Sequence, residues 1–190
     1  LQGIFRMNYT ASAAWTNSRG NIPATVEIAW VDLALNNTQT VWAAAANSNG
    51  LPMIFKSTDG GQAWTNTYLL DNNQNISTGW SGDSGAFWLT SNEAPLGFDV
   101  SPSDPNQVIV ADGTGHITSD GGASWRATYV HPAYQNAAGQ TTAIQKTYKS
   151  SGLDVTTAHH IYWVNDQNML VSNTDIGQTY SADAGETWTF

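Results

Sequence analysis

The stretch Ser57-Thr58-Asp59-Gly60-Gly61-Gln62-Ala63-Trp64-Thr65 decides the fold of this chain, because it is written three times. The second copy covers residues 118–126 and reads TSDGGASWR, and the third covers residues 181–189 and reads SADAGETWT. The tryptophans of successive copies lie a little over sixty residues apart. A constant spacing of this length indicates one supersecondary unit that is repeated along the chain.

Each copy has the chemistry of a tight β-hairpin. An Asp follows Ser or Thr by two residues, so that its carboxylate can accept hydrogen bonds from backbone N–H groups of the turn. A Gly two residues later tolerates positive φ, and the Trp starts the next strand and buries a large ring between neighbouring units. We therefore expect structural turn residues at Asp59, Asp120 and Asp183 and core residues at Trp15, Trp64, Trp125 and Trp188.

The three copies resemble the Asp-box, S/T-x-D-x-G-x-x-W, of sialidase-like and xyloglucanase-like β-propellers. The resemblance implies an all-β propeller of four-stranded antiparallel blades. A propeller closes with roughly four to eight blades, so about three blades plus partial blades predict a fragment of a larger propeller, completed by the same protein or a second chain. The expected parts are a blade tail over residues 1–20, blades over about 21–70, 95–130 and 152–190, and long loops over 70–96 and 131–158.

The two long loops predict which end of the blades does the work. Both connect an outer strand to the next inner strand, and such connections emerge on the same face as the connection between the second and third strands. The repeated turns lie on the opposite face. Long loops usually carry function, so we expect the site among them.

Two carboxylates fall on this working face. Asp112 and Asp175 each precede the first residue of a repeated turn by six positions, which places both in a connection between second and third strands. Glycoside hydrolysis uses two carboxyl groups: one protonates the leaving oxygen, and the other activates water or attacks the sugar. Each Asp also has a structural alternative, because Asx side chains bind local backbone and Asp112-Gly113 is an ordinary turn pair.

A longer segment around Asp175 adds a second resemblance. Residues 173–185 read NTDIGQTYSADAG and are similar to the T-D-[IV]-G-G-x-[YF]-x-S-x-D-x-G stretch of glycoside hydrolase family 74, the xyloglucanases. Residues 152–156, GLDVT, resemble the G-[LM]-E-[VE]-T approach to an inner strand in that family. The family carries a catalytic carboxylate in its D-[IV]-G-G segment, which implies Asp175 as general acid or base. Gln178 stands where the family has its second glycine, and the family's catalytic partner comes from another propeller.

Aromatic residues of the long loops are candidates for stacking on pyranose rings, with a small satellite core that anchors the loops as the alternative. They are Trp80, Trp88, Tyr134 and Tyr148. We expect no metal and no cofactor: cysteine is absent, and His159 and His160, as neighbours in a strand, point to opposite faces. A net charge of −9 with six basic residues disfavours nucleic acid and anionic membrane surfaces as partners.

These observations favour a segment of a secreted glycoside hydrolase that binds a polysaccharide or oligosaccharide and acts on a neutral β-glucan such as xyloglucan. The alternative is a non-catalytic propeller that binds carbohydrate or protein as a scaffold. A third possibility is an assembly factor of the kind that helps photosystem maturation, which would need a basic docking patch. A sialidase is disfavoured, because sialic acid recognition uses three arginines and Arg126 is expected away from the cleft.

Overall fold

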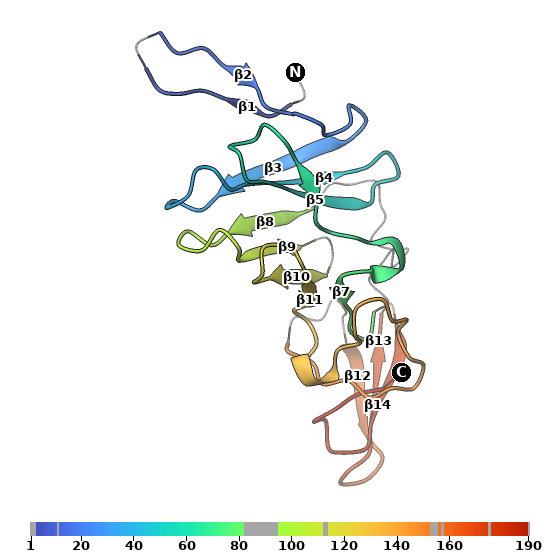
Figure 1. Cartoon of the computed structure of the whole chain (residues 1–190). Coiled ribbons are helices and arrows are strands. Elements are labelled where there is room, and N and C mark those ends of the chain that lie inside the picture. Colours follow the sequence, from blue (N-terminus) through green and yellow to red (C-terminus); the bar gives the residue numbers. More distant parts are fainter. Residues whose placement is uncertain are drawn as a thin grey trace.

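The computed structural model of this protein describes residues 3–10, 12–81, 95–111, 114–152, 156, 158–174 and 176–189. Its regular structure is almost entirely β (Figure 1), with two single 3-10 turns at Asp71–Asn73 and Pro132–Tyr134. The strands form three sheets, each built on an antiparallel meander, and one preceding hairpin. The predicted all-β class, built as consecutive propeller blades, is confirmed.

The first sheet has four strands in chain order: β3 (Glu27–Leu33), β4 (Val41–Ala46), β5 (Pro52–Ser57) and β6 (Thr65–Asn66). Strand β4 reads VWAAAA and is buried at every position. A strand that is covered on both faces has no polar side to alternate with, which explains its continuous apolar run. Its alanines also leave room for close neighbours on both faces.

The second sheet repeats this meander with β8 (Gly97–Val100), β9 (Val108–Ala111), β10 (Gly115–Thr118) and β11 (Trp125–Ala127). It gains a fifth strand, β7 (Ile76–Ser77), which pairs in parallel with β11. This strand comes from the segment that the sequence predicts as a long loop. By pairing with the outer strand it covers an edge whose backbone groups would otherwise face solvent.

The third sheet contains β12 (Ala158–Trp163), β13 (Met169–Asn173) and β14 (Gly177–Ser181). The fourth strand expected after it is reduced to two isolated bridges, Thr189 with Tyr180 of β14 and Trp188 with Tyr148 of the preceding loop. The N-terminal hairpin consists of β1 (Phe5–Arg6) and β2 (Thr16–Asn17).

The strand registers make the repeats equivalent residue by residue. The repeated turns start at Ser57, Thr118 and Ser181, which pair with the first residues of the second strands, Val41, Val108 and Met169. The third and fourth strands pair equivalently: Lys56 pairs with Thr65 and Ile117 with Arg126. In the hairpin, Arg6 pairs with Thr16 in the same way. The hairpin therefore corresponds to the third and fourth strands of a blade.

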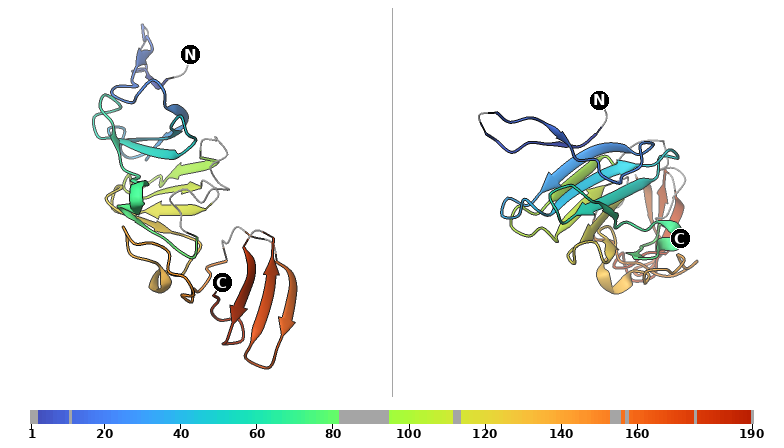
Figure 2. Two further views of the ribbon diagram at one scale, coloured as in Figure 1. Left: turned by 90° about the vertical axis from the view of Figure 1, so that its right-hand side faces the viewer. Right: turned by 45° about the horizontal axis from the view of Figure 1, so that its top comes forward.

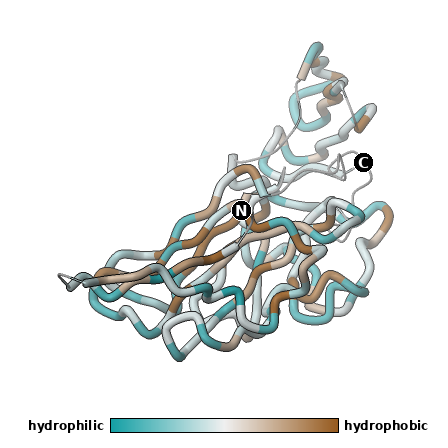
Figure 3. The backbone as a smooth tube through the Cα atoms, turned by 90° about the horizontal axis from the view of Figure 1, so that it is seen from above, coloured by the Kyte–Doolittle hydropathy of each residue, from teal (hydrophilic) through white to brown (hydrophobic). Residues whose placement is uncertain are grey.

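The largest core cluster lies where the first two sheets meet. Trp42, Ile54 and Tyr68 of the first sheet pack against Val110 and Trp125 of the second. The Trp125 ring lies edge-on to Tyr68 at 5.3 Å and to Trp42 at 6.3 Å. Hydrophobic segments run along the strands in the middle of these stacked sheets (Figure 3). The inner strands β3 and β8 are in contact, as expected for adjacent blades.

The third sheet departs from this regular stacking. Its strands run steeply across the direction of those in the first two sheets, in Figure 1 and in the left view of Figure 2. Strand β12 is exposed along its whole length, and Trp163 is 58% exposed. Trp15 is also exposed, contrary to the burial predicted for it, because a repeat tryptophan needs a preceding sheet to receive its ring and the described residues contain none ahead of the hairpin.

Candidate functional site

The repeated turns share one hydrogen-bond pattern. In the first turn, Ser57 Oγ donates to Asp59 Oδ1 at 2.7 Å and accepts from the Gly61 N–H at 2.8 Å. Asp59 Oδ1 also accepts from the backbone N–H groups of Gln62 and Ala63. The Ser or Thr and the Asp together satisfy the backbone donors of the turn, which explains why both residues recur.

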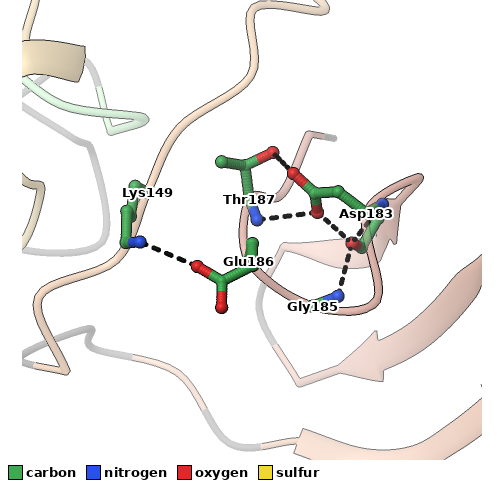
Figure 4. A network of polar contacts seen from close by, with 6 residues as sticks. Lys149, Asp183, Gly185, Glu186 and Thr187 are labelled. Atoms are coloured by element: carbon green, nitrogen blue, oxygen red, sulfur yellow. Dashed lines mark hydrogen bonds and ion pairs between the residues drawn. The ribbon is translucent and has the colours of Figure 1, made fainter. Parts of the chain in front are cut away.

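The third turn has the same pattern (Figure 4). Asp183 accepts from the hydroxyl of Ser181 at 2.8 Å and from the N–H and hydroxyl of Thr187 at 2.9 and 2.6 Å. Beside it, Lys149 Nζ forms an ion pair with Glu186 at 2.8 Å, which ties the preceding loop to the turn.

Hydrogen bonding lowers the pKa of all three turn carboxyls. At Asp59 the main cause is the hydrogen bond from the Ala63 N–H, and at Asp183 it is the hydrogen bond from the Thr187 hydroxyl. At Asp120 partial burial raises the pKa, but the bonds from Ser124 and Thr118 outweigh it. A carboxylate whose oxygens accept bonds from its own turn is an anionic acceptor and a poor proton donor, so these three residues do not have the properties of a general acid.

The opposite end of the sheets carries the long connections. Asp112, Asp175 and Trp88 lie outside the described residues. Their neighbours in the chain are described: Ala111 and Gly115 pair at the end of β9 and the start of β10, and Asn173 and Gly177 pair at the corresponding place in the third sheet. Positions 112 and 175 therefore fall in the connections between second and third strands.

A cavity of about 330 Å³ lies between the third sheet and the loops that precede it. Its walls include three aromatic rings, Trp80, Tyr148 and Trp188. The rest of the lining is aliphatic or neutral polar: Ser150, Thr156, Ala158, Ile161, Val171, Asn173, Ile176 and Thr179. Asn173 and Ile176 stand on either side of position 175 in the chain.

The structure brings two of the predicted loop aromatics to this cavity. Trp80 and Tyr148 are only 9% and 3% exposed, because they also belong to a small core with Tyr129 and Val130. Trp80 lies edge-on to Tyr129 at 5.6 Å. These two rings thus anchor the loops and face the cavity at once. Tyr134 is half-buried against this core and edge-on to His131, and it is not among the residues that line the cavity.

A buried polar group holds the two loops together. Asn136 donates from Nδ2 to the carbonyl of Gly79 at 2.9 Å and accepts at Oδ1 from Lys146 Nζ at 2.7 Å. Lys146 also lies over the Tyr148 ring at 5.0 Å. Neither Asn136 nor Lys146 could be singled out from the sequence, because an Asn among many and one of two lysines in the same loop carry no positional signal.

A second cavity, of about 570 Å³, lies at the same end of the first sheet. Its lining mixes amide side chains such as Asn47, Asn66 and Asn72 with Tyr68 and Leu70. Asn72 has φ of 53°, in the left-handed region that non-glycine residues seldom occupy. This cavity is more polar than the first, and none of the predicted site residues that the structure describes lines it.

The histidines hold no metal-like arrangement in the part of the chain that the structure describes, where no group of three His, Cys, Asp or Glu residues could bind an ion. His159 Nε2 is hydrogen-bonded to Thr174 Oγ1 at 2.7 Å. His116 is fully buried between the rings of Tyr68 and Tyr129. Within the same residues, none of the helical segments has the length and apolarity required to cross a bilayer.

No family model matches this chain, and no curated protein sequence matches it either. Among solved structures it is similar to a GH74 enzyme from Niastella koreensis, with 20% identity, a TM-score of 0.46, and coverage of 95% of this chain and 30% of that one. The GH74 xyloglucanase from Xanthomonas campestris gives 14% identity, a TM-score of 0.40, and coverage of 93% and 30%.

The protein YCF48 from Cyanidioschyzon merolae is also similar, with 12% identity, a TM-score of 0.27, and coverage of 88% of this chain and 85% of that one. The chain thus spans about 30% of the length of the two GH74 structures. At these identities and TM-scores the likeness does not extend to an activity, a substrate or a partner of this chain.

Proposed function

We propose that this protein is part of a secreted glycoside hydrolase that binds a neutral β-glucan, such as xyloglucan, and cleaves it by carboxylate general acid/base catalysis. In this proposal the repeated turns are Asp-boxes that hold the blades together, and the catalytic carboxylates are Asp175 and Asp112. Secretion follows from the substrate, because plant-type β-glucans lie outside the cell.

The observation that supports the proposal is the aromatic cavity beside the third sheet. Rings at Trp80, Tyr148 and Trp188 offer flat apolar surfaces of the kind that pack against pyranose faces. Asn173, Thr179 and Ser150 offer neutral donors and acceptors for sugar hydroxyls. Its described lining carries no charged side chain, which suits a neutral sugar better than an anionic one.

The position of Asp175 in the chain links this cavity to hydrolysis. Two residues close to it in sequence, Asn173 and Ile176, line the cavity. In this proposal the Asp175 carboxyl group acts on a sugar bound in the cavity, either as the acid that protonates the glycosidic oxygen or as the base that activates water. Asp112 occupies the equivalent connection in the second sheet and is proposed as its partner.

The test compares matched variants of the complete protein. Wild type, Asp175→Asn and Asp112→Asn are incubated with soluble xyloglucan and mixed-linkage β-glucan, and the products are separated by chromatography. Loss of a general acid or base lowers the rate by roughly 10²–10⁴-fold, so we expect a loss of that size at Asp175. Unchanged hydrolysis in Asp175→Asn removes this residue from the mechanism.

A non-catalytic carbohydrate-binding propeller is the second candidate, and Gln178 favours it. Gln178 occupies the place of the second glycine in the xyloglucanase-like stretch, and it is a paired strand residue opposite Ser172. The aromatic cavity serves binding alone equally well. Wild-type protein that retains β-glucan in affinity electrophoresis without cleaving it would establish this alternative.

A further inference from the structure

We call the contact between two successive sheets a joint. The first joint, between the hairpin and the first sheet, and the second, between the first and second sheets, share one pattern. Trp64 Nε1–H donates to the carbonyl of Ser18 in the hairpin, and Trp125 Nε1–H donates to the carbonyl of Thr67 in the first sheet, both at 2.9 Å. Ser18 and Thr67 are equivalent residues, since their N–H groups pair with the carbonyls of Ile4 and Ile54. The next equivalent is Thr128, whose N–H pairs with Gly115.

At the third joint, loop residues occupy both places that a repeat tryptophan would take. The Thr128 carbonyl accepts from Ser151 Oγ. Tyr129 is equivalent to Tyr68, but the indole edge-on to it is Trp80 at 5.6 Å, whereas Tyr68 has Trp125 at 5.3 Å. Trp188 lines the cavity instead.

The residues that would meet in a regular joint have different surroundings here. Ile109 is equivalent to the fully buried Trp42, yet it is 42% exposed. On the third sheet, Met169 and Val171 are equivalent to Val108 and Val110, the residues with which the second sheet covers the first. Met169 and Val171 are buried, and Val171 lines the cavity, whereas Ile109 of the second sheet stays partly exposed.

We infer that the third sheet has two docking positions on the second, and that Trp80 decides between them. In the open position described here, the Trp80 ring packs edge-on against Tyr129 and the cavity is present. In the closed position Trp188 replaces Trp80 at Tyr129, its indole N–H donates to the Thr128 carbonyl, and the cavity is filled. Trp80 thereby controls access to the cavity, whatever the cavity binds.

The experiment measures the distance between the sheets with spin labels, which the absence of cysteine makes specific. The reporter pair Ser103→Cys with Asp166→Cys joins exposed connections between the first and second strands of the second and third sheets. The matched control Thr38→Cys with Ser103→Cys joins the equivalent connections of the first and second sheets. Closed protein gives the reporter pair a distance close to that of the control pair.

Two variants should raise the closed population in double electron–electron resonance. Trp80→Ala removes the ring that competes for Tyr129, and we expect about a tenfold rise in the closed-to-open ratio. Ser151→Ala, an exposed position, frees the Thr128 carbonyl and should raise the ratio about threefold. Trp188→Ala should abolish the closed component. An unchanged control distance shows that each variant is folded.

The inference is overturned if the reporter pair shows no component near the control distance in wild type, Trp80→Ala and Ser151→Ala alike. It is also overturned if wild type shows only that component, because the open position is then not occupied. Neither result depends on hydrolysis, so both are independent of the proposed enzymatic function.

Discussion

At the joint between the first and second sheets the two sheets pack directly together, whereas at the joint between the second and third sheets a cavity lies between the third sheet and the loops that precede it. At the former joint, Lys56 Nζ donates to the carbonyl of Gly121 at 3.1 Å and to Asn106 at 3.3 Å. Arg6 forms the equivalent bond to the Gly60 carbonyl at 3.0 Å. Ile117 holds this position before the third sheet, and its side chain has no group that can donate a hydrogen bond.

The glycines of the repeated turns show the same difference. A Cβ added at Gly122 would lie 2.6 Å from the Cβ of Thr67 in the preceding sheet. At Gly185 the nearest atoms belong to Met169 and Trp188 of its own sheet, both at 3.5 Å. A sheet therefore packs closely where the preceding sheet supplies a cationic side chain and a carbonyl that accepts from the tryptophan indole. It stays apart at the third sheet, where the cation is missing and the carbonyl of Thr128 is bonded to Ser151.

The largest expected effect is a difference in the free energy of unfolding between substitutions of the tryptophans at the two joints. Trp125→Ala should lower the free energy of unfolding by about 3–5 kcal/mol, because Trp125 is fully buried against Trp42 and Tyr68. Trp188→Ala should cost about 1 kcal/mol, since its partly buried ring faces a cavity. Urea unfolding followed by circular dichroism measures both, and equal losses would contradict the difference between the joints.

A smaller effect is expected at the turns themselves. Ala184 has φ of 56° at the place where the other turns have Gly60 and Gly121, so Ala184→Gly should raise the free energy of unfolding by about 0.5–1 kcal/mol. The reverse change, Gly121→Ala, should cost about 1–3 kcal/mol. Its Cβ would meet Lys56 Nζ at 2.4 Å and Asn106 Oδ1 at 2.7 Å. Thermal unfolding of Ala184→Gly and Gly121→Ala checks the predicted direction of each stability change. Destabilisation by Ala184→Gly would show that the third turn is not strained.

The smallest effect concerns acid. The pKa values of Asp59, Asp120 and Asp183 are lower in the folded protein, so the unfolded chain binds more protons as the pH falls. Their contribution is complete above the unfolded value of about 4 and is lost as the pH drops below it through the folded values. Urea midpoints between pH 6 and pH 2.5 should fall, and Asp120→Asn should flatten the curve. A midpoint that stays constant below pH 4 would contradict these shifts.

The repeats were predictable because their determinants are local. A Ser or Thr, an Asp two residues later and a glycine with positive φ are enough to specify each turn, and the apolar runs on either side specify strands. Those features predicted the antiparallel meanders, the opposite placement of turns and long connections, and the burial of Trp64 and Trp125. The burial predicted for Trp15 is wrong for a non-local reason, since burial of its ring depends on another sheet.

The candidate site depended on contacts that no local pattern carries. Strand β7, the Asn136 network between the loops and the place of Trp80 at Tyr129 join residues about fifty or more positions apart. The sequence by itself determined the repeating sheet and its turn, because hydrogen bonds within a few residues fix both. Only the tertiary structure decided how each sheet meets the next, because equivalent aromatic and backbone groups compete for the same partners and the outcome depends on all of them together.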